Sequence, residues 1–163
     1  MLRATKIVPA GIWHGTPADV VRLDYDRRTR RRIALTGTAG LAFLLDLSKA
    51  SVLRSGDGIR LEDGRIVRVE AASERLLEIT CADEKALARI AWHLGNRHLA
   101  TEIGDRVIHI RDDHVIADMA AGLGAAVRSV ERPFHPEGGA YGHGAVHGHS
   151  HGHHHHHDGG NDH

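Results

Sequence analysis

The stretch Ala82–His98, ADEKALARIAWHLGNRH, decides the fold of the second half of the chain, because it predicts a helix with defined ends. Asp83 is a suitable N-cap residue, since its carboxylate can accept a hydrogen bond from a free backbone N–H of the first turn. Apolar residues then recur on one face at helical spacing, at Leu87, Ile90, Ala91 and Leu94. Gly95 and Asn96 both tolerate the left-handed conformation in which many helices end, so we expect the helix to stop there.

The segments around this helix predict a βαββαβ order. Leu76, Leu77 and Ile79 indicate a strand before the helix, and LATEIGDRVIHI, residues 99–110, predicts two short strands after it. AAVRSVERPF, residues 125–134, predicts the last strand. With a second helix between these strands, the order is the split βαβ arrangement of ferredoxin-like folds.

The second helix is predicted over RDDHVIADMAAGLG, residues 111–124. Asp112 or Asp113 would cap its start, and Gly124 would end it. Its packing face is expected to hold Val115, Ile116, Met119 and Leu123.

The first half of the chain predicts strands only. Apolar residues cluster in the short runs KIV, DVVRLDY, RIALT and FLLDL. SGDGIRLEDGRIVRVEA, residues 55–71, is the clearest hairpin: Ile59 and Leu61 alternate before the turn, and Val67 and Val69 alternate after it. Asp63-Gly64 supplies the positive φ angles that a tight hairpin turn requires.

The sequence therefore predicts an α+β protein in three parts. Residues 1–72 are expected to form an all-β domain, and residues 73–137 a ferredoxin-like domain. Residues 138–163 consist mostly of Gly, His, Asp, Ser and Asn. Because such a segment buries too little apolar surface to offset the entropy of ordering, we expect a disordered His-rich tail.

Composition excludes several classes of protein. Formal charge balances at 21 basic and 21 acidic residues, which argues against a nucleic-acid partner. The single cysteine, Cys81, cannot form an internal disulfide and is expected to be a small buried residue on a strand. The N-terminus has no apolar core long enough for a signal peptide, and no stretch approaches the roughly 20 apolar residues that span a bilayer. We therefore expect a soluble cytoplasmic protein with no membrane partner.

The basic run Arg27–Arg32, RRTRRR, has two interpretations. It could contact an acidic partner or RNA, or it could be a solvated hairpin beside the strand RIALT. Without interleaved aromatic residues, a solvated or protein-contacting run is favoured.

Histidine is the strongest chemical signal, since eleven of the 16 histidines lie at or after His135. Imidazole nitrogen binds nickel, copper and zinc ions, so a dense histidine run predicts metal binding. An engineered tag would be a plain hexahistidine, whereas this tract is interrupted by Gly and Ser and continues to His163. Passive metal storage by the tail alone is the main alternative to a role in metal delivery.

The histidines outside the tail are more ambiguous. His98 follows the first helix, where the helix dipole favours a surface histidine even without a ligand role. His114 lies beside Asp112 and Asp113, whose carboxylates could cap the second helix or join a metal shell. His109 is expected to point out of the sheet, and His93 to be solvated or partly packed; His14 belongs to no motif.

Taken together, RTRRRIALTGTAGLAFLLDL, GDGIRLEDGRIVRVEAASE, AWHLGNRH, DDHVIADMAAGLG and the His-rich end resemble the urease accessory protein E family. These are the nickel metallochaperones of urease maturation. The resemblance implies a β-rich partner-binding domain and a ferredoxin-like metal-binding domain through which a homodimer forms. It also implies that His98 of each subunit binds one shared metal ion, and that the partners are a maturation GTPase and the apo-urease accessory complex.

The resemblance is incomplete at two places. Some members carry His-Asp-His where this chain has Asp112-Asp113-His114, so Asp112 and His114 would form a weaker His/carboxylate site. The tail varies among members, and its candidate ligands here are His143, His147, His149, His151 and His153. The expected function is delivery of Ni²⁺, with Zn²⁺ or Cu²⁺ as other ions that these ligands bind. No catalytic motif points to an enzyme.

Overall fold

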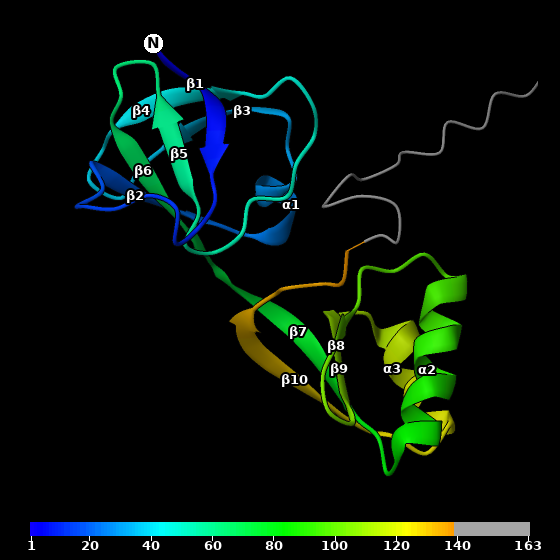
Figure 1. Cartoon of the computed structure of the whole chain (residues 1–163). Helices are drawn as coiled ribbons and strands as arrows, with labels where there is room; N and C mark the ends of the chain where they lie inside the picture. The colour runs from blue at the N-terminus through cyan, green and yellow to red at the C-terminus, as the bar shows by residue number, and fades with distance from the viewer. Residues whose placement is uncertain (139–163) are drawn as a thin grey trace, which may run out of the picture.

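The computed structural model describes residues 1–138, which form two lobes (Figure 1). The N-terminal lobe is β-rich, as predicted, and holds a six-stranded sheet in the order β2-β6-β5-β1-β4-β3. Its strands are β1 (Leu2–Val8), β2 (Asp19–Leu23), β3 (Arg32–Thr36), β4 (Ala42–Asp46), β5 (Gly58–Leu61) and β6 (Ile66–Ala71). The expectation of disorder concerns residues that, apart from Gly138, lie outside this description.

The predicted hairpin is β5 and β6, which pair antiparallel. Its four alternating residues, Ile59, Leu61, Val67 and Val69, are buried in the core of the lobe. Within the turn, Gly64 has a φ of +88°, whereas Asp63 has no positive φ. The turn therefore needs the conformational freedom of one glycine rather than of the Asp-Gly pair.

A short helix, α1 (Tyr25–Arg28), interrupts the part predicted to be all-β. Asp24 caps it, since its side chain accepts a hydrogen bond from the Arg27 N–H. Arg28 is only 1% exposed, so the interpretation of the basic run as solvated is wrong at this residue. Its guanidinium donates to the carbonyl oxygens of Leu23 and Phe134, because a buried charge needs hydrogen-bond partners.

These contacts join α1 to the end of the second lobe. The rings of Tyr25 and Phe134 meet edge to face with centroids 5.5 Å apart. Arg111 Nη1 lies 2.7 Å from Asp26 Oδ1 in an exposed ion pair. Phe134 itself is fully buried, so the chain that leaves the last strand is fixed at the junction between the lobes.

The C-terminal lobe has the predicted βαββαβ order. Its elements are β7 (Ser73–Thr80), α2 (Glu84–Asn96), β8 (Glu102–Ile103), β9 (Val107–Arg111), α3 (His114–Gly122) and β10 (Ala126–Pro133). The strands form an antiparallel sheet in the order β10-β7-β9-β8. Both helices cover one face of this sheet (Figure 1).

Helix α2 packs as its spacing predicts. Asp83 accepts the Ala86 N–H at 2.8 Å, which confirms the N-cap. Ile90 and Leu94 are buried against the sheet, and Leu87 and Ala91 pack against the same cluster. Cys81 is buried and follows directly after β7, and burial raises the pKa of its thiol.

Helix α3 is capped by Asp113, whose carboxylate accepts from the Val115 and Ile116 N–H groups. Ile116 is buried, and Met119 packs against the same core. The prediction is wrong for Val115 and Leu123, which are 57% and 37% exposed, because the short helix turns only one narrow face to the sheet. None of the helices in residues 1–138 is long and apolar enough to cross a membrane.

Candidate metal site

His98 lies in an unusual backbone conformation just after α2. The helix ends at Asn96, as predicted, but neither Gly95 nor Asn96 has a positive φ. The left-handed residue is instead His98, with a φ of +54°. The His98 N–H donates to the Gly95 carbonyl at 3.1 Å and the Leu99 N–H to the Leu94 carbonyl at 3.4 Å, the pair of bonds that defines a Schellman motif.

Helix α3 ends in the same motif with the residue that the motif normally uses. There Gly124, with a φ of +90°, donates to the Ala121 carbonyl at 3.0 Å. The Ala125 N–H donates to the Ala120 carbonyl at 3.1 Å. His98 therefore occupies a position where glycine would be less strained, since left-handed backbone costs an L-residue about 1–2 kcal/mol.

We expect His98→Gly to raise the free energy of unfolding by about 0.5–1 kcal/mol, because glycine removes this strain but adds entropy to the unfolded chain. Gly124→Ala, which places a side chain in the matching position of α3, should lower it by about 1 kcal/mol. Urea unfolding of the two variants measures both effects. A loss of stability in His98→Gly equal to that in Gly124→Ala would show that His98 is not strained.

The side chain of His98 is presented to solvent. Residue 98 is exposed, as are Gly95, Asn96 and Arg97 before it. Trp92, on the same helix, is 64% exposed and meets the half-buried His93 ring at a centroid distance of 5.0 Å. This end of α2 therefore offers an accessible imidazole on a backbone that is rigidly held by two hydrogen bonds.

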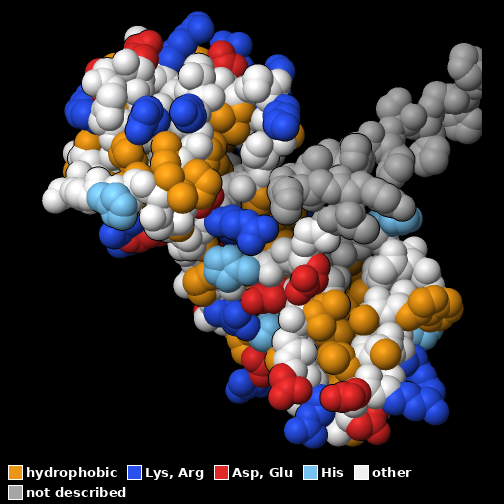
Figure 2. Space-filling model, viewed as in Figure 1, with side chains coloured by type: hydrophobic (Ala, Val, Ile, Leu, Met, Phe, Trp, Pro, Cys, Tyr) orange, Lys and Arg blue, Asp and Glu red, His pale blue; other side chains and the backbone are white. Residues whose placement is uncertain are grey.

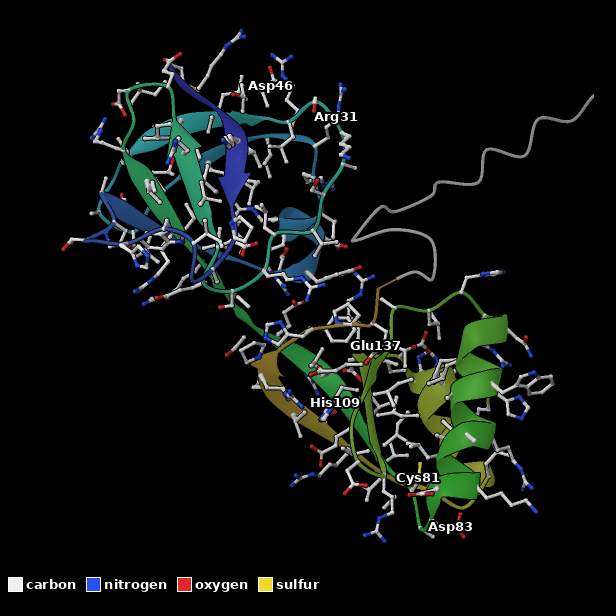
Figure 3. All side chains as sticks on the ribbon, viewed as in Figure 1. Arg31, Asp46, Cys81, Asp83, His109 and Glu137 are labelled. Atoms are coloured by element: carbon white, nitrogen blue, oxygen red, sulfur yellow. The ribbon has the colours of Figure 1, made fainter. Side chains whose placement is uncertain are left out.

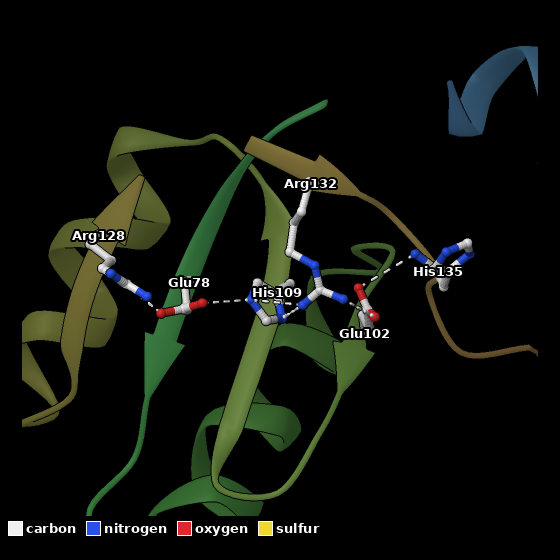
Figure 4. Close-up of polar contacts among 6 residues, drawn as sticks. All are labelled: Glu78, Glu102, His109, Arg128, Arg132 and His135. Carbon is white, nitrogen blue, oxygen red and sulfur yellow. Dashed lines mark hydrogen bonds and ion pairs between the residues drawn. The ribbon is translucent and has the colours of Figure 1, made fainter. Parts of the chain in front are cut away.

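His109 has a different role from His98. It does lie on the sheet face without helices, as expected, but it is buried within a polar network (Figure 4). Its Nε2 lies 3.0 Å from Glu78 Oε2, and its Nδ1 lies 3.0 Å from Arg132 Nη1. Arg132 Nη1 also lies 3.1 Å from Nε2, so the guanidinium covers the ring and both ring nitrogens have polar neighbours.

This network crosses the whole sheet. Arg128, Glu78, His109 and Glu102 lie opposite one another on β10, β7, β9 and β8. Hydrogen bonds from Arg128 and His109 hold the pKa of Glu78 below its ordinary value. Arg132 Nη2 donates to Glu102 Oε1 at 3.0 Å and so links β10 to the far edge of the sheet.

Asp112 and Asp113, which lie beside His114 in the predicted peripheral site, each contact another group. Asp112 Oδ2 lies 3.1 Å from Arg75 Nε, and Asp113 caps α3. His114 is exposed in the first turn of α3. Within residues 1–138, no group of three His, Cys, Asp or Glu side chains is arranged to hold a metal ion. The tail candidates His143, His147, His149, His151 and His153 lie outside the described residues.

Sequence reasoning missed the segment after β10, residues 134–138, which we call the strap. The strap leaves β10 at one edge of the sheet and reaches β8 at the other, where the Glu137 N–H donates to the Thr101 carbonyl at 2.8 Å. The Ile103 N–H donates to Glu137 Oε1 at 3.3 Å. Figure 3 shows Glu137 at the end of the lobe opposite Cys81 and Asp83, which is the end where α2 terminates.

The fold and these residues define a class: two-lobed α+β proteins that present a histidine at a helix end and carry a histidine-rich C-terminal sequence. A sequence model of the UreE urease accessory protein N-terminal domain matches residues 4–72. The corresponding model of the UreE C-terminal domain matches residues 74–159. The chain belongs to the UreE family of urease accessory proteins, which is a family of accessory proteins and not of enzymes.

Individual relatives agree over most of their length. The chain is 55% identical over 141 residues to the urease accessory protein UreE of Beijerinckia indica, covering 86% of this chain and 82% of the relative. It is 57% identical over 141 residues to UreE of Bradyrhizobium sp. strain BTAi1, covering 86% and 68%. It is 45% identical over 148 residues to UreE of Rhodobacter capsulatus, covering 91% and 92%.

Proposed function

We propose that this protein is a nickel metallochaperone that delivers Ni²⁺ for assembly of the urease active site. The observation that carries the proposal is His98: an exposed imidazole held where glycine would be more stable. Strain of this kind persists at functional positions, where the surrounding structure maintains it. Because the chain belongs to a family of urease accessory proteins, urease is the proposed acceptor of the metal.

The proposed site is shared between two subunits. One His98 offers a single nitrogen, whereas nickel takes more ligands, so two copies related by a two-fold axis would contribute two imidazoles. The remaining positions would be filled by tail histidines or water. Flexible ligands allow the ion to leave by ligand exchange, which a closed and rigid site would slow.

We assign residues 73–137 as a ferredoxin-like domain for metal binding and dimerisation. The βαββαβ order and the antiparallel strand order support this fold. Figure 2 shows apolar side chains at the surface of the lobe that holds α2 and α3. Trp92, Val115 and Leu123 are the large exposed ones on or beside these helices, and apolar surface of this kind is typical of an interface.

We assign residues 1–72 as the domain that binds a protein partner. Lys and Arg outnumber Asp and Glu in this range, and Figure 2 shows Lys and Arg side chains over the visible face of the lobe. Arg31 projects from this lobe in Figure 3. A basic surface favours an acidic protein face, for which the maturation GTPase and the apo-urease complex are the proposed partners. We place the protein in the cytoplasm with them.

Activation of apo-urease tests delivery against storage, the second candidate function. A chain lacking residues 143–163, loaded with one Ni²⁺ per dimer, should still activate apo-urease in the presence of the maturation GTPase, because His98 remains. The same chain with His98→Gly should not. If the tail-less chain fails while the full chain succeeds in proportion to tail-bound nickel, the protein is a histidine-rich store and not a dedicated chaperone.

A further inference from the structure

We propose that Glu137 is a positioning residue, which fixes the origin of the His-rich tail beside His98. The inference rests on the proposed function, because it assumes that His98 and tail histidines share an ion. It is carried by contacts among described residues: the two hydrogen bonds that join Glu137 to Thr101, just before β8, and to Ile103, within β8.

The strap is held at three successive points. Phe134 is fully buried at the lobe junction, where Arg28 donates to its carbonyl oxygen. The His135 N–H donates to Glu102 Oε2 at 3.4 Å, and Glu102 is itself held by Arg132 (Figure 4). Glu137 forms the last point, so the chain is guided from one edge of the sheet to the other before the tail begins.

The last point lies close to His98 along the chain. Thr101, whose carbonyl accepts the Glu137 N–H, is three residues after His98. Three extended residues span at most about 11 Å, so the strap ends within that backbone distance of the candidate ligand, plus one hydrogen bond. Among the described residues, β10 pairs with β7 alone and lies at the opposite edge of the sheet, so its packing does not require this route.

Chain length shows why this matters for metal binding. The first tail histidine, His143, is six residues beyond Glu137, and six residues span at most about 22 Å. If Glu137 were released, His135 would become the last anchored residue, eight residues before His143. Effective concentration falls with about the −3/2 power of length, so release should lower it about 1.5-fold from length alone. Moving the origin away from β8 would lower it further.

Three substitutions separate the two contacts of Glu137. Glu137→Pro removes both the N–H donor and the carboxylate, and it follows Pro136, whose backbone is already restricted. Glu137→Ala removes only the side-chain acceptor. Glu137→Gln keeps a donor and an acceptor at the same places and removes only the charge. Glu131→Ala on β10 is the control for loss of an exposed glutamate.

The experiment measures the nickel affinity of the full chain by chelator competition below one Ni²⁺ per dimer, where the tightest site fills first. Glu137→Pro should weaken this affinity about two- to five-fold, Glu137→Ala less, and Glu137→Gln and Glu131→Ala not at all. In chains that lack residues 143–163, all four variants should match their parent. The thermal unfolding midpoint checks that each variant is folded.

Two results would overturn the inference. One is an unchanged affinity for Glu137→Pro in the full chain, and the other is an equal loss with and without the tail, which would mean that the strap acts on the His98 segment itself. The proposed function fails separately: His98→Gly in the full chain would then keep the affinity of the parent, whatever the Glu137 variants show.

Discussion

Truncation of the chain before His143 should leave one tightly bound Ni²⁺ per dimer, and His98→Ala in that truncated chain should remove it. The full chain should bind additional ions because its sequence carries many imidazoles after Gly138. Truncation should therefore lower the number of ions bound, while the tightest ion stays on His98 with a lower affinity. Loss of groups that merely orient metal ligands costs 10–100-fold in affinity. Loss of both direct imidazoles of a dimer should therefore cost more than about 100-fold. Calorimetry and mass spectrometry of the intact dimer, with and without nickel, measure affinity and stoichiometry.

The backbone conformation of residue 98 provides the control for this experiment. His98→Ala retains the left-handed strain, whereas His98→Gly relieves it and is expected to be more stable than the parent. Both should lose the tight ion to the same extent. His114→Ala, in the first turn of α3, removes another exposed histidine and should leave the ion in place. A tight ion that survives His98→Gly in the truncated dimer would disprove the assignment.

Nickel affinity of the truncated dimer should fall roughly 100-fold between pH 7.5 and pH 5.5. An imidazole binds metal only in its neutral form, and histidine side chains as a class gain a proton near pH 6.5. One pH unit below that value about nine in ten imidazoles are protonated, which costs about tenfold for each of two ligands. Nickel affinity should therefore be retained above about pH 6.5 and lost as the pH falls below it. Calorimetry at the two pH values checks the prediction.

Equal affinity at the two pH values would mean that carboxylates, and not two imidazoles, hold the ion. A tenfold loss would indicate a single histidine ligand. In the truncated chain, His98→Ala tests whether this pH dependence belongs to the proposed site. Any nickel that the variant still binds should not show the 100-fold loss of affinity between pH 7.5 and pH 5.5.

The parts of the fold that depend on local pattern could be predicted from the sequence. The apolar residues of α2 recur within a few residues of one another, and so do the alternating residues of β5 and β6. Each of these patterns predicted its element correctly. The predicted end of α2 at Gly95 and Asn96 was correct, but the left-handed residue lies further on, at His98. Leu99 packs against the cluster that contains Leu94, as the C″ residue of a Schellman motif commonly does, and this spacing could have placed the left-handed residue at His98.

The features that could not be predicted depend on contacts between residues far apart in the chain. Arg28 lies in a basic run that looked solvated, and its partner Phe134 is 106 residues away. Glu137 contacts Ile103 across 34 residues. His109 alternates as a surface residue would, but Arg132 covers it from a different strand. No local pattern indicates such contacts, because they arise only when the strands are brought side by side.

The central claim is that two His98 imidazoles, one from each subunit, bind one nickel ion on a two-fold axis. A crystal structure of the truncated dimer with nickel, located by its anomalous scattering, tests this most directly. The account predicts one nickel on the axis, bonded to both His98 rings at the roughly 2.0–2.1 Å typical of metal–imidazole bonds. A nickel bound elsewhere, with the two His98 side chains far apart across the dimer, would contradict it.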